Sequence, residues 1–353
     1  MSRNNKINLN NFQACLLGGA VGDALGAPLE FMHGMYLDND VEKITKYIEY
    51  GNGQGRFTDD TQMTLFTAEA LIINKYETQE SPTHIPLQGT MHKSYLRWLT
   101  TQGPASPVKQ TSLSQNPIMQ HERAPGITCI KALHEGTMGT IEHPINDRKG
   151  CGGIMRVAPV GLAYAEDPEK AFSLAASAAA ITHSHPVGFL TAGCLGAIIA
   201  ELAQGKNLKN AIDTAMDILH SYDKNRGTLK AITDALDLYD DTTHDFTIEE
   251  YQTLGEGWIA EETLALSLFA SLHHEHNFKQ GVIDSVNHKG DSDSTGSVTG
   301  NILGIINGLD EIPLEYITNL EGADLIADIS TDLYNAYHEP FNNKDTFWEK
   351  YIE

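Results

Sequence analysis

Apolar residues recur at three- and four-residue spacing along most of this chain, and no other feature restricts its fold as strongly. That spacing puts apolar side chains on one face of an α-helix. It predicts helices over residues 61–75, 171–181, 187–204, 208–222, 258–273 and 323–337. The alternation typical of strands is scarce, although KITKYIEY at 43–50 suits either a short strand or one helical turn. We therefore expect an all-α protein.

The chain has 353 residues, which is long for one hydrophobic core. Its predicted helices nevertheless follow one another without a linker, so we expect one compact multi-helix domain over residues 1–353. Residues 1–11 form a short N-terminal extension in this interpretation. Residues 100–125 are rich in Pro, Ser, Gln and Gly. Because loops this long are usually functional or disordered, we place this one beside a cleft.

Two short acidic blocks, far apart in the sequence, each stand directly before a predicted helix. They are TDD at 58–60 and DSDS at 291–294. One carboxylate at a helix start caps free N–H groups, so either block alone is typical of an ordinary N-cap. Each block, however, supplies two carboxylates and a hydroxyl where a cap needs one oxygen. Closely packed negative charges repel each other, so this surplus indicates neutralisation by a cation or by solvent.

The types of ligand in these blocks select the metal. Carboxylate and hydroxyl oxygens favour Mg²⁺ or Mn²⁺, suit Ca²⁺ less well and suit Zn²⁺ poorly. The stretch from Asp291 resembles the start of an EF-hand loop, but the twelfth position, where that loop needs a Glu, is Ile302. Neither HExxH nor a CxxC pair occurs, so the zincin and zinc-ribbon hypotheses have no support.

The segment LLGGAVGDALGAPLEF holds four glycines, at 18, 19, 22 and 26, along a stretch with helical spacing. Small residues there permit close backbone approach, as in simple helix–helix packing. The segment ends at Glu30, whose neighbours are apolar. A carboxylate in such surroundings tends to have a raised pKa or a charged partner, which makes Glu30 a candidate for acid–base work. Glu262, on another largely apolar helix, is interpreted as part of a solvated face.

A third cluster is the glycine-rich segment GCGGIMRVAPVGL at 150–162. It lacks the GK[ST] ending of a P-loop, and it is not a GxGxxG motif that follows a strand. Gly150, Gly152 and Gly153 can form a tight turn, and they can also present backbone N–H groups to a phosphate oxygen. Both interpretations remain open on this pattern alone.

A fourth cluster, ITHSHPVGF, places His183 and His185 at the end of an alanine-rich helix that Pro186 closes. A histidine near a helix C-terminus is favoured by the helix dipole, which makes these residues candidates for capping. The alternative is a histidine that donates to a hydroxyl or phosphate of a ligand.

Composition indicates the compartment and the partners. The N-terminus has no apolar signal core, and we expect no segment long enough to span a bilayer. The four cysteines are widely separated, so we expect reduced thiols and a cytoplasmic protein. A net charge of −23 argues against nucleic-acid binding and fits cationic protein clients.

Seven motifs, in this order, resemble the ADP-ribosylglycohydrolase family: GDALGAPLEF, FTDDTQMT, RAPG, GCGGIMRVAPVGL, THSHP, GEGWIAEETLALSL and GDSDSTGSVTGNILG. They extend from about Gly18 to Gly308 and so cover most of the chain. The acidic pair with its neighbours is the specific part of the resemblance. The family includes the dinitrogenase-reductase-activating glycohydrolase and the ADP-ribosylarginine and ADP-ribosylserine hydrolases.

The resemblance implies a compact all-α domain with a dinuclear Mg²⁺ or Mn²⁺ centre at the bottom of a cleft. The implied metal ligands are Thr58, Asp59, Asp60, Asp291, Asp293 and Ser294. Glu30 matches a family glutamate that gates or assists substrate binding. Implied substrate contacts are a loop that holds the diphosphate, Gly152, Gly153 and Met155, and the histidine His183. For this last position His185 is an alternative alignment, because it lies only two residues away.

The activity implied is hydrolysis of the N-glycosidic bond between ADP-ribose and an arginine side chain of a modified protein. Two cations can chelate ribose hydroxyls and activate water. The bond breaks through an oxocarbenium-like state, which nearby anionic oxygens stabilise. The candidate catalytic residues are Asp60, Asp293 and Glu30, of which Glu30 is the one not expected to be fully committed to metal.

Two alternatives stay open. A non-catalytic module could bind ADP-ribosylated proteins in the same pocket, although intact acidic blocks favour an enzyme. An immunity-type protein could also bind and block an ADP-ribosyltransferase toxin, using segment 1–11 or 32–55 as a plug. The expected partners are therefore ADP-ribosylated proteins or such a toxin, with no nucleic acid and no membrane.

Overall fold

The computed structural model describes residues 7–30, 43–80, 86–241, 246–339 and 349–351. Within these residues the chain forms helices joined by turns, with two isolated β-bridges and no strand, which confirms the all-α class. The α-helices are α1 (Leu9–Glu30), α2 (Asp59–Glu80), α3 (Leu87–Thr101), α4 (Ser112–Gln115), α5 (Ile127–His134), α6 (Ala158–Ala163), α7 (Pro168–Ala180), α8 (Pro186–Ala203), α9 (Leu208–His220), α10 (Arg226–Asp241), α11 (Ile248–Tyr251), α12 (Ala260–His273), α13 (Phe278–Val286), α14 (Ser292–Asn307), α15 (Leu314–Asn319) and α16 (Ala323–His338).

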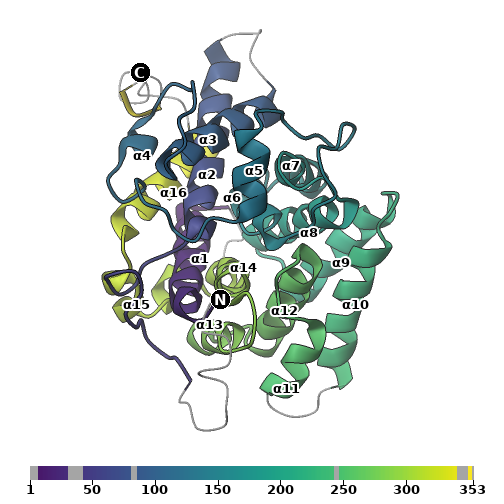
Figure 1. Ribbon diagram of the computed structural model, residues 1–353. Helices are drawn as coiled ribbons and strands as arrows, with labels where there is room; N and C mark the ends of the chain where they lie inside the picture. Colours follow the sequence, from purple (N-terminus) through teal and green to yellow (C-terminus); the bar gives the residue numbers. More distant parts are fainter. Residues whose placement is uncertain (1–6, 31–42, 81–85, 242–245, 340–348, 352–353) are drawn as a thin grey trace.

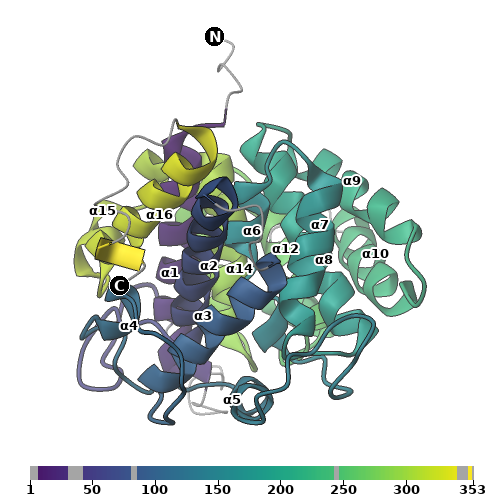
Figure 2. The ribbon, with the colours of Figure 1, turned by 90° about the horizontal axis from the view of Figure 1, so that it is seen from above.

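Helices α1 and α14 lie side by side in the middle of the molecule (Figure 1). Seen from above, α15 and α16 lie on one side of them and α7 to α10 on the other (Figure 2). One cluster of buried apolar side chains includes members of α1, α2, α8, α12, α14 and α16. The core is therefore built from both ends of the sequence.

Side-chain caps fix several helix starts. Asn8 and Asn11 exchange backbone-to-side-chain hydrogen bonds of 3.3 and 3.1 Å at the start of α1. The carboxylate of Asp167 accepts the N–H of Lys170 at 3.0 Å, and Pro168 occupies the first position of α7. Because Pro lacks an N–H that the first turn would leave unpaired, this pairing favours a helix start. Helix α1 begins at Leu9, inside the segment 1–11 interpreted as an extension.

Glycines allow the backbones of α1 and α14 to touch. A Cβ atom on Gly22 would lie 1.9 Å from the carbonyl oxygen of Gly296, and one on Gly18 would lie 2.4 Å from that of Gly300. The side chain of Asn301 donates to the carbonyl of Cys15 at 2.8 Å. The close approach expected from the glycine spacing is present, and it fixes the end of α1 beside the start of α14.

We expect Gly22→Ala to destabilise the protein by about 2 kcal/mol or more. Alanine raises helix propensity by about 1 kcal/mol, but the new methyl group overlaps a backbone carbonyl that cannot rotate away. Urea denaturation of the metal-free protein measures the difference. Gly53→Ala is the control, since the Cβ there meets, among the described residues, the flexible side chain of Arg56 alone. Equal stability of the two variants would contradict a rigid α1–α14 contact.

The expectation that no segment is long enough to span a bilayer is wrong for two helices. Both α1 and α8 are long and apolar enough to cross a bilayer, whereas no such segment was expected. In each helix 89% of the apolar window is buried inside the protein. Their apolar character is thus accounted for by the core, since helices that are apolar on all sides occur in the interior of large proteins.

The segment KITKYIEY is neither a strand nor a helical turn. Its backbone is paired with side chains instead: Ile44 exchanges two hydrogen bonds with the amide of Asn287, at 2.8 and 2.9 Å, and the carbonyl of Thr45 accepts the hydroxyl of Tyr316 at 2.7 Å. These partners, Asn287 directly after α13 and Tyr316 on α15, satisfy backbone groups that a ladder or helix would otherwise pair.

Candidate metal centre

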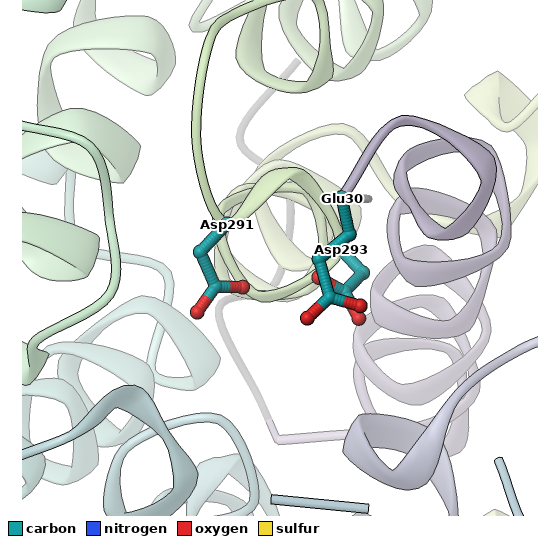
Figure 3. A group of neighbouring side chains, drawn as sticks. All are labelled: Glu30, Asp291 and Asp293. Carbon is teal, nitrogen blue, oxygen red and sulfur yellow. The ribbon is translucent and has the colours of Figure 1, made fainter. Parts of the chain in front are cut away.

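Three helix ends bring the acidic residues together. Glu30 is the last residue of α1, Asp59 and Asp60 are the first two of α2, and Asp291 and Asp293 stand at the start of α14. One carboxylate oxygen each from Glu30, Asp291 and Asp293 lies within 4.8 Å of the others. Figure 3 shows the carboxylates of Glu30 and Asp293 next to each other although they come from different helices.

Capping explains part of the two acidic blocks. Asp291 is the N-cap of α14, and its carboxylate accepts the N–H of Ser294 at 3.2 Å. The hydroxyl of Thr58 accepts the N–H of Asp60 at 3.3 Å, so Thr58 has the capping role in the first block. The carboxylates of Asp60 and Asp293 are not used as caps in this way, and each keeps a buried oxygen without a hydrogen-bond partner among the described residues.

The segment 100–125 was predicted as one long loop, but it contains the end of α3 and the whole of α4. Its far end meets the first acidic block. The carboxylate of Asp59 accepts the N–H of Gly126 at 3.1 Å, and its own N–H donates to the carbonyl of Arg123 at 2.8 Å. The guanidinium of Arg123 in turn donates to the carbonyl of Phe57 and to Glu321, at 3.0 and 2.8 Å. These contacts fix the position of Asp59 from outside its own helix.

Asp23 is a site residue that the sequence did not reveal. It lies in the middle of α1 and is fully buried, and its carboxylate accepts the backbone N–H of Thr58 at 2.9 Å and that of Thr61 at 3.0 Å. The hydroxyl of Thr61 donates to the same carboxylate at 2.6 Å. The available signal was a charged residue in an otherwise apolar, glycine-rich helix. Charged side chains are rarely buried unless they have a partner.

Six carboxylates thus share one interior region, and we call them the acidic cluster: Asp23, Glu30, Asp59, Asp60, Asp291 and Asp293. The five aspartates are at most 4% exposed, and Glu30 is half-buried. In the described part of the chain no Lys, Arg or His forms an ion pair with any of them. Buried charges are costly without a partner, so the cluster needs positive charge.

Burial and mutual repulsion raise the pKa values across the cluster. Burial first, and then the charge of Asp293, raises the pKa of Glu30 to about 11 and that of Asp60 well above its usual range. The same two causes raise the pKa of Asp23 to about 7, against hydrogen bonds from Thr61 and Thr58 that lower it. The raised pKa values mean that the folded protein holds these carboxylates in their charged form only at a cost in free energy.

The cluster fits hard divalent cations. Buried oxygens of Glu30, Asp60 and Asp293 lack a hydrogen-bond partner among the described residues. Among the residues that the structure describes, the converging donors are oxygens, apart from the thiol of Cys151, whose pKa is raised by burial and by Asp291 and Asp60. Oxygen-rich, carboxylate-rich sites are those that Mg²⁺ and Mn²⁺ prefer.

The glycine-rich segment forms a short 3₁₀ turn over Cys151–Gly153. The N–H groups of Cys151 and Met155 donate to the carbonyls of Trp258 and Cys151, at 3.2 and 3.1 Å, and that of Gly153 lies 3.5 Å from the carbonyl of Gly150. Those N–H groups are already hydrogen bonded within the protein. The tight turn is therefore present, and the diphosphate role of Gly152, Gly153 and Met155 stays a prediction.

His183 packs beneath this turn. A Cβ on Gly152 would lie 3.1 Å from the Cε1 atom of His183, and the Nδ1 atom of His183 is 2.9 Å from the hydroxyl of Thr182. Burial, with Arg156 and Arg148, lowers the pKa of His183 to about 3. His183 is thus a neutral imidazole that supports the turn, and its predicted contact with substrate is not tested by this geometry.

His185 has a role that differs from the one expected. Helix α7 ends at Ala180, so His185 does not cap it. The Nδ1 atom of His185 instead accepts the N–H of Val187 at 3.2 Å and caps the start of α8. A neutral imidazole nitrogen is a hydrogen-bond acceptor, which makes it suitable at a helix start.

Glu262 is half-buried and does not belong to a solvated face as expected. Its carboxylate accepts the N–H groups of Glu256 and Gly257 at 3.0 and 3.2 Å. The carbonyl of Glu256 then accepts the N–H of Asp291 at 2.8 Å. Glu262 therefore holds the loop that supports the start of α14.

The sequence of residues 4–343 matches the model of the ADP-ribosylglycohydrolase family. The ADP-ribosyl-[dinitrogen reductase] glycohydrolase of Rhodospirillum rubrum is 26% identical over 318 residues, which cover 86% of this chain and 88% of the relative. The ADP-ribosylarginine hydrolase Tri1 of Serratia proteamaculans is 22% identical and covers 94% of this chain, with 81% of its own length matched.

A similar relative in Danio rerio, ADP-ribosylhydrolase ARH3, is 22% identical over 96% of this chain and 93% of its own. Among solved structures, a chain of an ADP-ribosylglycohydrolase-related protein complex has the same fold, with a TM-score of 0.68 and 23% identity. It covers 93% of this chain and 98% of its own length. With the family model matched along nearly its whole length, the chain belongs to the ADP-ribosylglycohydrolase family.

Proposed function

We propose that this protein is a metal-dependent hydrolase that removes ADP-ribose from modified protein side chains, most specifically from arginine. The family consists of glycohydrolases, which supports hydrolysis of a glycosidic bond. The observation that carries the proposal is the acidic cluster, which has no ion-pair partner among the described residues. Glu30, Asp291 and Asp293 lie within metal-ligand distance of one another, and the charge of Asp293 reaches the three other members and raises their pKa values.

Two Mg²⁺ or Mn²⁺ ions would be held by Thr58, Asp59, Asp60, Asp291, Asp293 and Ser294. Bound there, the cations supply positive charge that polarises oxygen atoms of the substrate and of water. The buried, unpartnered oxygens of Asp60 and Asp293 support this assignment. The bond from Gly126 holds the Asp59 carboxylate, and the cap to Ser294 holds that of Asp291, so both are oriented in advance.

The residues of the chain have separate tasks in this proposal. Anionic oxygens of the cluster stabilise the positive charge that develops on the ribose ring. Asp60, Asp293 and Glu30 are the candidate bases, and Glu30 stands at the half-exposed edge of the cluster. The turn at Gly152, Gly153 and Met155, with His183 beneath it, is the proposed contact for the diphosphate part of the substrate.

Arginine is the proposed acceptor because the chain resembles relatives that act on it, one of which is named an ADP-ribosylarginine hydrolase. The test incubates the protein with arginine-, serine- and cysteine-linked ADP-ribosyl substrates, with and without Mg²⁺, and measures free ADP-ribose. We expect release from the arginine-linked substrate only when Mg²⁺ is present. Release from the serine-linked substrate alone would show that the acceptor is serine and not arginine.

The same assay tests the alternatives. Tight binding of the modified substrate without release would indicate a non-catalytic binding module. Of the segments considered as plugs for a toxin, residues 1–6 and 32–42 lie outside the described residues, and those that are described have no feature that favours a toxin contact. A cytoplasmic location is part of the proposal, and the four unpaired thiols support it.

We expect Glu30→Gln to lower turnover by roughly a hundredfold or more, as is typical when an acid–base group is lost. Glutamine keeps the size of the side chain and one oxygen but cannot take up a proton. Single-turnover rates measure the chemistry, and calorimetric titration with Mn²⁺ measures metal affinity. Glu30 lies within 4.8 Å of Asp291 and Asp293, so the titration decides between two roles. Metal affinity lost together with activity would make Glu30 a ligand, and unchanged turnover would remove it from catalysis.

A further inference from the structure

Asp23 links α1 to the first turn of α2. Its Oδ1 atom accepts the N–H of Thr58 at 2.9 Å, and its Oδ2 atom accepts the N–H of Thr61 at 3.0 Å. Oδ2 also accepts the hydroxyl of Thr61 at 2.6 Å. A helix start leaves its first N–H groups without partners inside the helix, and here a side chain from another helix supplies the acceptors.

These bonds occupy both oxygens of Asp23. Its situation differs from that of Asp60 and Asp293, each of which has a buried oxygen with no hydrogen-bond partner among the described residues. A carboxylate whose two oxygens already accept N–H and O–H groups has little capacity left for a cation. The acidic cluster therefore contains carboxylates of two kinds, and Asp23 belongs to the kind that contacts protein.

The groups that Asp23 contacts surround the proposed ligands. Thr58 immediately precedes Asp59 and Asp60, and Thr61 immediately follows them. Holding both flanking residues fixes the backbone of the turn from which the two aspartates project. Gly22, the neighbour of Asp23, lies against the backbone of α14, so the position of Asp23 is itself set by the helix that carries Asp291 and Asp293.

We infer that Asp23 is a positioning residue that aligns the Thr58–Asp60 turn of α2 with the start of α14, so that both halves of the cluster face the same pair of cations. This inference rests on the proposed function, because it concerns the cation site of that function. Residues that hold the direct ligands of a metal in place typically contribute 10- to 100-fold to metal affinity. A carboxylate that only capped α2 would contribute to stability alone.

The experiment titrates Mn²⁺ into the metal-free full-length protein by calorimetry and by electron paramagnetic resonance, without substrate. For Asp23→Ala we expect Mn²⁺ affinity to fall by about 10- to 100-fold with the number of bound ions unchanged. For Asp23→Asn we expect an Mn²⁺ affinity between those of the wild type and of Asp23→Ala. Asparagine keeps one oxygen as an acceptor, but its NH₂ group faces donor groups at the position where the second carboxylate oxygen of Asp23 accepts hydrogen bonds. Thr61→Val keeps the carboxylate and removes one donor, so it should weaken Mn²⁺ binding less than Asp23→Ala.

The matched control is Asp167→Ala, which removes a carboxylate cap from α7, where Asp167 accepts the N–H of Lys170. It should lower the melting temperature and leave Mn²⁺ affinity unchanged. If Asp23→Ala and Thr61→Val behave like this control, Asp23 is an ordinary cap and the inference is wrong. Loss of one ion, with the other bound as in the wild type, would make Asp23 a direct ligand and also overturn it. A wild-type protein that binds no Mn²⁺ would refute the proposed metal dependence itself, which separates the two failures.

Discussion

Asp293→Ala is expected to lower the rate of ADP-ribose release by about a thousandfold or more, since a metal contributes several kcal/mol to transition-state stabilisation. Asp293 stands in the first turn of α14 and has a buried oxygen without a partner among the described residues, and its charge raises the pKa of Glu30 and of Asp60. Asp59→Ala and Asp60→Ala should have effects of the same order. Steady-state release from an arginine-linked substrate measures the loss.

The stability of the Asp293→Ala variant without metal is a second, independent measurement. Removing Asp293 removes one of several negative charges that repel each other, so the variant should melt no lower than the wild type in EDTA. Asp284→Asn is the control: this buried carboxylate forms an ion pair with Lys43 at 2.8 Å, and the ring of His274 lies 3.0 Å away. Its loss should destabilise the protein and leave metal-dependent activity in place. Near-normal rates for Asp293→Ala would show that the reaction does not depend on the carboxylate of Asp293.

Removal of divalent cations should abolish activity, and addition of Mg²⁺ or Mn²⁺ should restore it. Removal of the cations should also lower the free energy of unfolding. A ligand that binds only the folded state contributes about 4 kcal/mol when its concentration is 1,000 times its dissociation constant. The acidic cluster gives the physical reason, since its buried carboxylates form no ion pair in the described part of the chain. Melting curves in EDTA and at increasing Mn²⁺ concentrations measure the shift.

A comparison of Mg²⁺, Mn²⁺ and Ca²⁺ tests the type of cation that the site binds. Hard oxygen donors should favour Mg²⁺ and Mn²⁺ over Ca²⁺, whose larger size and longer bonds suit a wider site. The Asp60→Ala variant serves as the matched control, because its melting temperature should rise much less on addition of Mn²⁺. Full turnover in EDTA-treated protein would show that the reaction proceeds without the proposed cations.

The helices were predictable because their apolar spacing is a local property. The predicted segments 208–222 and 323–337 coincide with α9 and α16 to within two residues. The segment 43–50 was not predictable, because its backbone is paired with Asn287 and Tyr316, which lie far away in the sequence. His185 was assigned to the wrong helix because two helices meet within a few residues there, and position alone does not say which end a histidine caps.

The site was predictable where its residues stood out locally. Two carboxylates and a hydroxyl before a helix exceed what a cap requires, so both acidic blocks could be found from the sequence. Asp23 could not be assigned, because its role depends on N–H groups of α2, a helix that begins more than thirty residues later. Glu262 was misread for a similar reason, since its partners are the backbone of a loop rather than another side chain.

The contact between α1 and α14 has a consequence for synthesis of the protein. Asn301 and Cys15, which bond across that contact, are 286 residues apart in the chain. Contacts at such separation form late, because a long loop must close before they contribute any stability. A nascent chain can therefore fold α2 and the alanine-rich helices while the carboxylates of α14 are still untranslated. The proposed cation site is completed only after α14 has been translated, so a chain that ends before Asp291 carries four of the six carboxylates of the acidic cluster and no complete site.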